Sequence, residues 1–230
     1  MDQVAVREDV LNQGWLGHTP LTFRRAVLDR CRLEQFKAGT QIYAVGDEPG
    51  GMFGLVKGGL GVSIAPGERG PYIAHFAMPG TWFGEAAAIT RQPRRVGLIA
   101  TRDSELLHLP LHAIDEIVGR DPSAWRLFAL VTIAHLDMAI GGSDDLMLRN
   151  HVQRLVAVLL RIGNCRRANP QDLHTIEIDM NHEDLAYMAN VARTTAGSIL
   201  RKLEADGHLA LSYRRIRILA PDALREMLRD

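Results

Sequence analysis

The sequence predicts an α+β protein with an N-terminal β-sandwich or barrel, a long apolar helix and a C-terminal winged helix-turn-helix. Three observations predict this order. Glycine-rich turns separate short apolar runs over residues 33–110, residues 122–140 are apolar around most of a helical circumference, and residues 180–219 read as two short helices followed by a hairpin. The pattern changes after Leu109-Pro110, from short apolar runs between turn signals to helical periodicity, and this change separates the two kinds of structure.

The first half has the pattern of an all-β domain. Turn-forming pairs recur every 8 to 13 residues between short apolar runs such as 52–56 and 61–64. This spacing is typical of a sandwich or barrel. Residues 4–30 are expected to be helical and to offer apolar side chains for packing on the barrel, namely Val10, Leu11, Leu21, Ala26, Val27 and Leu28.

A long helix is expected to begin at Asp121-Pro122, because proline is tolerated in a first helical turn. A helix that is apolar on most sides needs cover on several faces. The barrel can bury one face, and a second copy of the same helix is the simplest partner for the other. Gly141-Gly142-Ser143 is expected to break or bend the helix and to act as a hinge. We therefore expect a β-rich domain over residues 1–120, a helix and hinge over 121–142, and a helical domain over 143–230.

Residues 180–210 predict two short helices joined by a tight turn. Asn181 is expected to cap the first helix, with Glu183 and Asp184 near its positive end. Residues 190–192 form the turn, and the second helix begins at Arg193 with its apolar residues facing the core. Its polar residues lie on or beside the exposed side and are Arg193, Thr194, Thr195, Ser198, Arg201 and Lys202. A helix-turn-helix needs an apolar back for packing and a polar front that reaches bases and phosphates.

A hairpin over residues 209–219 follows, with arginines at or near its tip, as in the wing of a winged helix. Between residues 193 and 217 six Arg or Lys stand against two acidic residues, whereas the whole chain balances 27 basic against 27 acidic residues. Positive charge is therefore concentrated where phosphate contacts would need it. An amphipathic helix pair alone is common and equally compatible with ordinary core packing, so the hairpin is what favours DNA.

Composition favours a compact cytoplasmic protein. The 230 residues suffice for two domains, and 47% of them are hydrophobic. No uninterrupted apolar run of membrane-spanning length occurs, and the N-terminus is too polar for a secretory signal. Cys31 and Cys165 lie in no metal-ligand spacing, so we expect both to be reduced and structural, with a redox-sensing thiol as the alternative.

Residues 33–220 resemble the Crp/Fnr family of bacterial transcription regulators. The marks are the Val-Lys-Gly-Gly-Leu run at 56–60, Phe83-Gly84-Glu85 with an arginine pair ten residues on, the long helix, and Arg193 in the helix-turn-helix. The resemblance implies a cyclic-nucleotide-binding-like jelly roll and a homodimer formed through the 122–140 helix. It also implies binding to double-stranded DNA at a palindromic operator, and a contact with RNA polymerase at the 168–175 loop.

The resemblance also implies a ligand site. Family members that bind cAMP hold its phosphate with a short helix and one arginine, and its ribose with a glutamate. Gly84, Glu85 and Arg95 match those positions, with Arg94 beside them. The candidate ligand-binding residues are Gly84, Glu85, Ala86, Arg94, Arg95, Val96 and Ala139.

Two departures leave the ligand open. Val96 replaces the hydroxyl residue after the arginine, and Ala139-Ile140 replaces the Thr-Ser pair that contacts adenine. Three alternatives remain for the effector: cAMP, another small anion such as a cyclic dinucleotide, or no nucleotide ligand. Without a ligand, Glu85 is expected to pair with Arg95 inside the β-rich domain. Some family branches bind haem, and the histidines that could serve as its ligands here are His18, His75, His108 and His135. Lone histidines in a β-rich domain are more often core or surface residues than ligands.

On the DNA side, Arg193 matches the family arginine that reads guanine, Thr195 a backbone contact and His182 a phosphate contact. Thr194 and Ser198 replace the usual glutamate and arginine, so we expect a half-site other than TGTGA that keeps one G·C pair. The candidate DNA-binding residues are His182, Arg193, Thr194, Thr195, Ser198, Arg201, Arg214 and Arg215.

No catalytic motif or metal site is found in the sequence, so an enzyme is not expected. The remaining alternative is a cyclic-nucleotide-responsive sensor module whose C-terminal domain binds protein rather than DNA. Such a module would not need an arginine-rich wing. The sequence does not distinguish an activator from a repressor.

Overall fold

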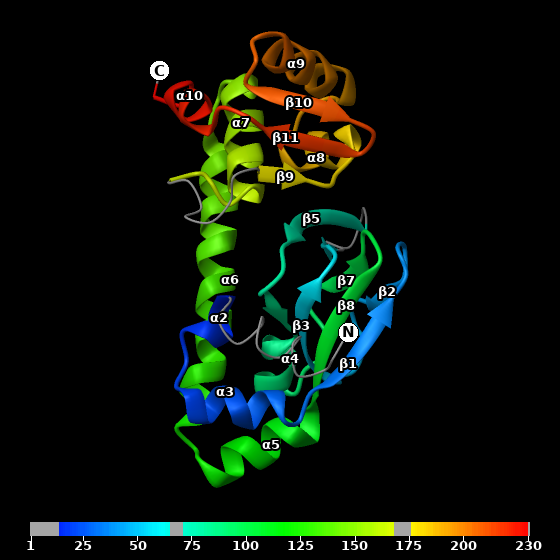
Figure 1. The fold of residues 1–230 in the computed structure, drawn as a ribbon, viewed down its shortest axis with the longest axis vertical. Coiled ribbons are helices and arrows are strands. Elements are labelled where there is room, and N and C mark those ends of the chain that lie inside the picture. Colours follow the sequence, from blue (N-terminus) through cyan, green and yellow to red (C-terminus); the bar gives the residue numbers. More distant parts are fainter. Residues whose placement is uncertain (1–13, 65–70, 168–175, 230) are drawn as a thin grey trace. The chain divides into compact units, whose positions relative to one another are not determined.

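The computed structural model describes residues 14–64, 71–167 and 176–229, and Figure 1 shows their helices and strands. The chain divides into two compact units. One comprises Met1–Pro71 and Phe76–Leu136, and the other comprises Tyr72–His75 and Asp137–Asp230. The predicted packing positions Val10 and Leu11 lie outside the described residues.

Two four-stranded sheets form the N-terminal domain, with strand orders β1-β8-β3-β6 and β2-β7-β4-β5. The strands are β1 (Arg32–Phe36), β2 (Gln41–Tyr43), β3 (Gly51–Lys57), β4 (Leu60–Ile64), β5 (Tyr72–Ala77), β6 (Trp82–Phe83), β7 (Gly97–Ala100) and β8 (Ser104–Pro110). One core cluster draws on both sheets, with Leu55, Leu60, Leu98 and Leu106 fully buried. The predicted β-rich domain is confirmed.

Helices α2 (Gly14–Gly17), α3 (Leu21–Leu28) and α5 (Leu111–Arg120) join the start of α6 (Ala124–Met147) in a second core cluster. Aromatic rings make much of this cluster: Phe23 lies 5.8 Å from Trp15 and 5.1 Å from Phe128 between ring centroids, edge to face in both pairs. Of the predicted packing residues, Val27 is buried as expected. Leu21 is 52% exposed, because α3 turns Phe23 inward from its first turn instead.

Helix α6 is longer than predicted, because it continues through Gly141-Gly142 to Met147. An interior glycine costs a helix only about 1 kcal/mol, which the remaining hydrogen bonds can offset. The break comes after Met147, where the Asn150 side chain accepts a hydrogen bond from Val152 N at 2.8 Å and caps α7 (His151–Ile162). The predicted break at the two glycines is therefore wrong.

The C-terminal unit is a winged helix-turn-helix, as predicted. Helix α7 is followed by β9 (Ile176–Ile178), α8 (His182–Met188), α9 (Arg193–Ala205), β10 (Leu209–Ser212), β11 (Arg215–Ile218) and α10 (Pro221–Glu226). The three strands form an antiparallel sheet in the order β10-β11-β9. Strand β9 was not expected from the sequence, and it places residues 176–178 beside the wing.

Candidate functional site

The helix-turn-helix is defined by local capping interactions. The Asn181 side chain accepts a hydrogen bond from Asp184 N at 2.8 Å, which confirms the predicted cap of α8. Asn190 adopts a φ of 49° in the turn, a conformation that asparagine tolerates better than most residues. Gly207, with a φ of 76°, ends α9. The α8–turn–α9 boundaries therefore follow from residues that the sequence already marks.

Arg154 in α7 fixes the turn between the two helices, a role that sequence reasoning missed. Its Nε donates to the Ala189 carbonyl at 2.6 Å and its Nη2 to the Asn190 carbonyl at 3.2 Å. Its Nη1 donates to the Leu148 carbonyl at 2.7 Å. An arginine within the apolar helix 151–162 is the signal that could have pointed to this role.

Helix α9 presents the polar face that was predicted for it. Ala196, Ile199, Leu200 and Leu203 are buried, which fixes the rotation of the helix about its axis. Thr195 and His182 are half-buried at the margin of this surface. The exposed residues are Arg193, Thr194, Ser198, Arg201 and Lys202. This arrangement can offer one guanidinium fork, short hydroxyls and flanking cations to a duplex groove.

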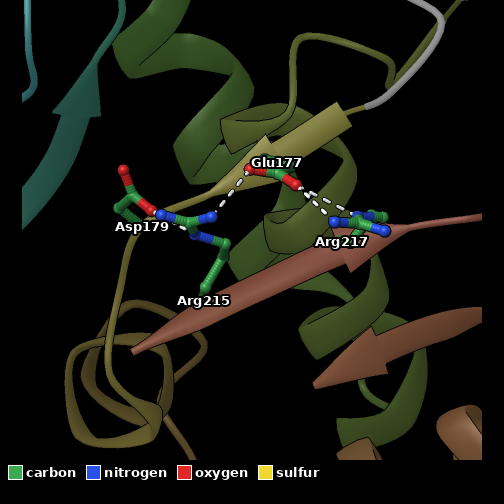
Figure 2. Close-up of polar contacts among 4 residues, drawn as sticks. All are labelled: Glu177, Asp179, Arg215 and Arg217. Atoms are coloured by element: carbon green, nitrogen blue, oxygen red, sulfur yellow. Dashed lines mark hydrogen bonds and ion pairs between the residues drawn. The ribbon is translucent and has the colours of Figure 1, made fainter. Parts of the chain in front are cut away.

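The wing differs from a simple cationic hairpin. Figure 2 shows Arg215 between Asp179 and Glu177, with Arg217 on the other side of Glu177. Arg215, a predicted DNA contact, is therefore engaged by two carboxylates of its own chain. Arg214 is exposed at the tip with a φ of 53°, beside Tyr213, whose exposed fraction is 91%.

Electrostatics link the wing tip to α8. Burial, reinforced by the neighbouring Glu183, raises the pKa of Asp184 above its ordinary value, although the Arg214 guanidinium acts in the opposite direction. Arg214 thus acts on a carboxylate of the first helix of the motif. The charge at the wing tip therefore affects the ionisation of a carboxyl group at the start of α8.

In the β-roll, Arg94 rather than Arg95 points into the domain. Arg94 is only 4% exposed, and its Nη2 donates to the Gly51 carbonyl at 3.0 Å. Its guanidinium carbon lies 4.2 Å from the centroid of the Tyr43 ring. Arg95 is exposed. The inward arginine therefore lies one residue earlier than the sequence match placed it, and Arg95 instead of Val96 takes the position after it.

The Arg94 guanidinium has unused donors. Among the described residues, neither Nε nor Nη1 of Arg94 has a hydrogen-bond partner, although both atoms are buried. Burial lowers the pKa of Arg94 and raises that of Tyr43. A Cβ added to Gly84, whose φ is 101°, would lie 2.4 Å from Nη1 of Arg94, so only glycine allows this approach. A buried cation with donors to spare is a site that an anion would complete.

Glu85 opens the short helix α4 (Glu85–Thr90) and is buried. Its Oε1 lies 2.9 Å from Nδ1 of His135 in α6, and the His135 ring stacks on Phe83 with centroids 5.0 Å apart. The pairing of Glu85 with Arg95 that was the alternative expectation is wrong, because His135 supplies the partner. Ala139 and Ile140 are exposed on α6.

Two of the histidines considered as haem ligands contact other groups of the chain. His108 contacts the Glu34 carboxylate at 2.8 Å and the Gly50 carbonyl at 2.9 Å, and His135 contacts Glu85. In the described parts of the chain no group of three or more His, Cys, Asp or Glu side chains could hold a metal ion. Burial raises the pKa of the Cys165 thiol to about 11, which disfavours the reactive thiolate.

Family models match both halves of the chain in this order. A model of the cyclic nucleotide-binding domain matches residues 33–121, and a model of the Crp-like helix-turn-helix domain matches residues 153–227. The chain belongs to the Crp/Fnr family of transcription regulators. Members of this family are regulatory DNA-binding proteins. No curated protein sequence matches this regulator.

Solved structures share the fold of this regulator. FixK2 from Bradyrhizobium japonicum is 18% identical over 85% of this chain and 96% of its own, with a TM-score of 0.72. A transcriptional regulator of the CRP/FNR family from Thermus thermophilus is 23% identical over 86% and 99%, with a TM-score of 0.65. The c-di-GMP responsive global regulator CLP of Xanthomonas campestris is 17% identical over 86% and 99%, with a TM-score of 0.65.

Proposed function

We propose that this regulator binds DNA sequence-specifically as a homodimer on a palindromic operator in the cytoplasm. The observation that carries the proposal is the polar face of α9, held outward by its buried apolar back and by the Arg154 contacts to the turn. Two such helices in a symmetric dimer would enter major grooves about one helical turn apart. RNA polymerase is the further partner proposed, although the 168–175 loop predicted to contact it lies outside the described residues.

Self-association is proposed to use α6. Leu130, Ile133, Leu136 and Ile140 are exposed at spacings of three or four residues, and so form one apolar stripe. By length and composition α6 could also cross a membrane. Its buried face, with Ala124, Phe128 and Val131, instead packs into the core of the β-roll domain, so the exposed stripe favours a second copy.

Base reading is assigned to the start of α9. The Arg193 guanidinium can donate to O6 and N7 of one guanine, while Thr194 offers a methyl group to thymine. Thr195, His182 and Arg201 flank this pair and would contact phosphates. Loss of the Arg193 contact should cost about 1–3 kcal/mol of binding and relax preference at one G·C pair.

The test is selection of bound sites from a randomised duplex pool with the full-length protein, with and without cAMP. We expect a palindrome whose G·C preference disappears in the Arg193→Ala variant and persists in Arg229→Ala, which removes an exposed arginine outside the helix-turn-helix. A palindrome with unchanged preference in Arg193→Ala would refute the assignment. No enrichment with either condition would refute DNA recognition.

We further propose that an anionic ligand in the β-roll controls DNA binding. The unpartnered donors of Arg94 suit a phosphate group, which supports a nucleotide such as cAMP or a cyclic dinucleotide. The residues fit the rest of cAMP less well, because Glu85 already contacts His135 and the positions after Arg94 carry no hydroxyl group. The Glu85–His135 contact connects α4 with α6, which is the element proposed to form the dimer.

A further inference from the structure

Strand pairing places acids beside the wing arginines. Strand β11 runs antiparallel to β9, and Arg217 is the register partner of Glu177. Ile216 and Ile218 point into the core, so the alternate residues of β11 lie on the outer face of the sheet. Asp179 follows directly after β9. Four charged residues from two strands distant in sequence therefore share one surface.

The contacts join these four side chains into one network. Nε and Nη2 of Arg217 donate to Oε1 of Glu177 at 3.0 and 2.8 Å. Nη1 of Arg215 lies 3.4 Å from Oε2 of Glu177, and its Nε lies 3.2 Å from Oδ1 of Asp179 (Figure 2). The two cations and two anions cancel, so the formal charge of the network is zero.

The arginines of the network can exchange their carboxylate partners for phosphates. The side chains of Arg215 and Arg217 are 50% and 49% exposed, so a phosphate can reach both guanidinium groups. Exposed ion pairs contribute little to stability, typically about 0–1 kcal/mol each. Sequence-independent DNA affinity, in contrast, depends directly on how many phosphates the protein neutralises. The same carboxylates therefore matter little for the fold and much for the cationic charge that the wing offers to DNA.

We propose that Glu177 and Asp179 compete with DNA phosphates for Arg215 and Arg217, and so restrain sequence-independent binding. This inference rests on the proposed DNA-binding function. The acids act without touching a base, because they lower affinity for every duplex by a phosphate term and leave the base contacts of α9 in place. The free-energy difference between operator and random DNA is then unchanged, while the affinity for random DNA falls.

The test measures binding of the full-length protein to the selected operator and to a random duplex of equal length, by fluorescence anisotropy between about 50 and 300 mM KCl. In the Glu177→Gln/Asp179→Asn variant, affinity for the random duplex should rise on the order of tenfold, and the slope of log affinity against log salt should steepen by about 1–2. Adding Arg215→Ala and Arg217→Ala should reverse the gain. Asp179→Asn alone, which keeps Glu177 between the arginines, should give a smaller change in the same direction.

Glu226→Gln is the matched control for Asp179→Asn, because Glu226 is an exposed acid paired with Arg229 in the same unit and each substitution changes the charge by one. It should leave the salt slope unchanged. Equal slopes in wild type and in the double variant, with equal thermal unfolding, would overturn the inference while leaving the proposed function intact. Wild-type protein that bound neither duplex would overturn the proposed function and this inference with it.

Discussion

Nδ1 of His135 lies 2.9 Å from Oε1 of Glu85, which joins the long helix α6 to the first residue of α4. Glu85 is buried, so this imidazole is the group that compensates its removal from water. The ring of His135 also stacks on Phe83, which immediately precedes the glycine before Glu85. A ligand that engaged Glu85 would have to act on a contact already made by the proposed dimerisation helix.

Replacement of His135 by alanine should lower the free energy of unfolding by about 1–3 kcal/mol, because a buried carboxylate loses its partner. Denaturant unfolding followed by circular dichroism measures the change. His112→Ala, at an exposed position of α5, is the control and should be close to neutral. Equal stability of the two variants would show that the Glu85–His135 contact adds nothing to the fold.

Arg94 and Arg95 should respond differently to an anion. With cAMP or inorganic phosphate at about 100 times the dissociation constant, wild type and Arg95→Gln should gain about 2.7 kcal/mol of stability, seen as a rise in Tm. Arg94→Gln should show no such gain, because the buried donors are removed. If Arg95→Gln lost the rise in Tm and Arg94→Gln kept it, the assignment of Arg94 as the anion-binding residue would be wrong. If wild type showed no rise in Tm, neither cAMP nor phosphate would bind at this site.

The exposed stripe of α6 predicts where a charge should disrupt the dimer. Leu136→Glu should weaken self-association at least about 100-fold, because the carboxylate would be buried without a partner. Sedimentation equilibrium measures this directly. His112→Glu introduces a carboxylate at an exposed position of α5, outside the stripe, and should leave association nearly unchanged. A dimer that tolerated Leu136→Glu would place the interface elsewhere.

The Cys165 thiol should be unreactive at neutral pH. Burial raises its pKa from an ordinary 9.0 to about 11. Between these two pH values the folded protein keeps the thiol proton that the unfolded chain has lost. Its contribution to stability is therefore intact below pH 9 and declines as the pH rises toward 11. Alkylation at pH 8 should be slow unless denaturant is added, as mass spectrometry can follow. Rapid modification of folded protein would instead support a redox-sensing thiol.

Local signals explain why the helix-turn-helix could be predicted closely. Asn181 caps α8, Arg193 begins α9 and Gly207 follows its end, and each depends on residues within one turn of the chain. The turn pairs of the β-roll are equally local, and α6 begins at Ala124, two residues after the proline that was expected in its first turn. The break predicted at Gly141-Gly142 is wrong for the opposite reason, since whether glycine ends a helix depends on what the following residues can form.

What the sequence by itself determined was the order of domains, the faces of α8 and α9, and the family, because periodicity and caps are properties of neighbouring residues. The tertiary structure alone decided which of two adjacent arginines is buried and which residue partners Glu85. It also decided that Glu177 and Asp179 neutralise the wing. A charge count over residues 193–217 cannot include acids on β9, since strand pairing brings them beside Arg215 and Arg217 only after the sheet has formed.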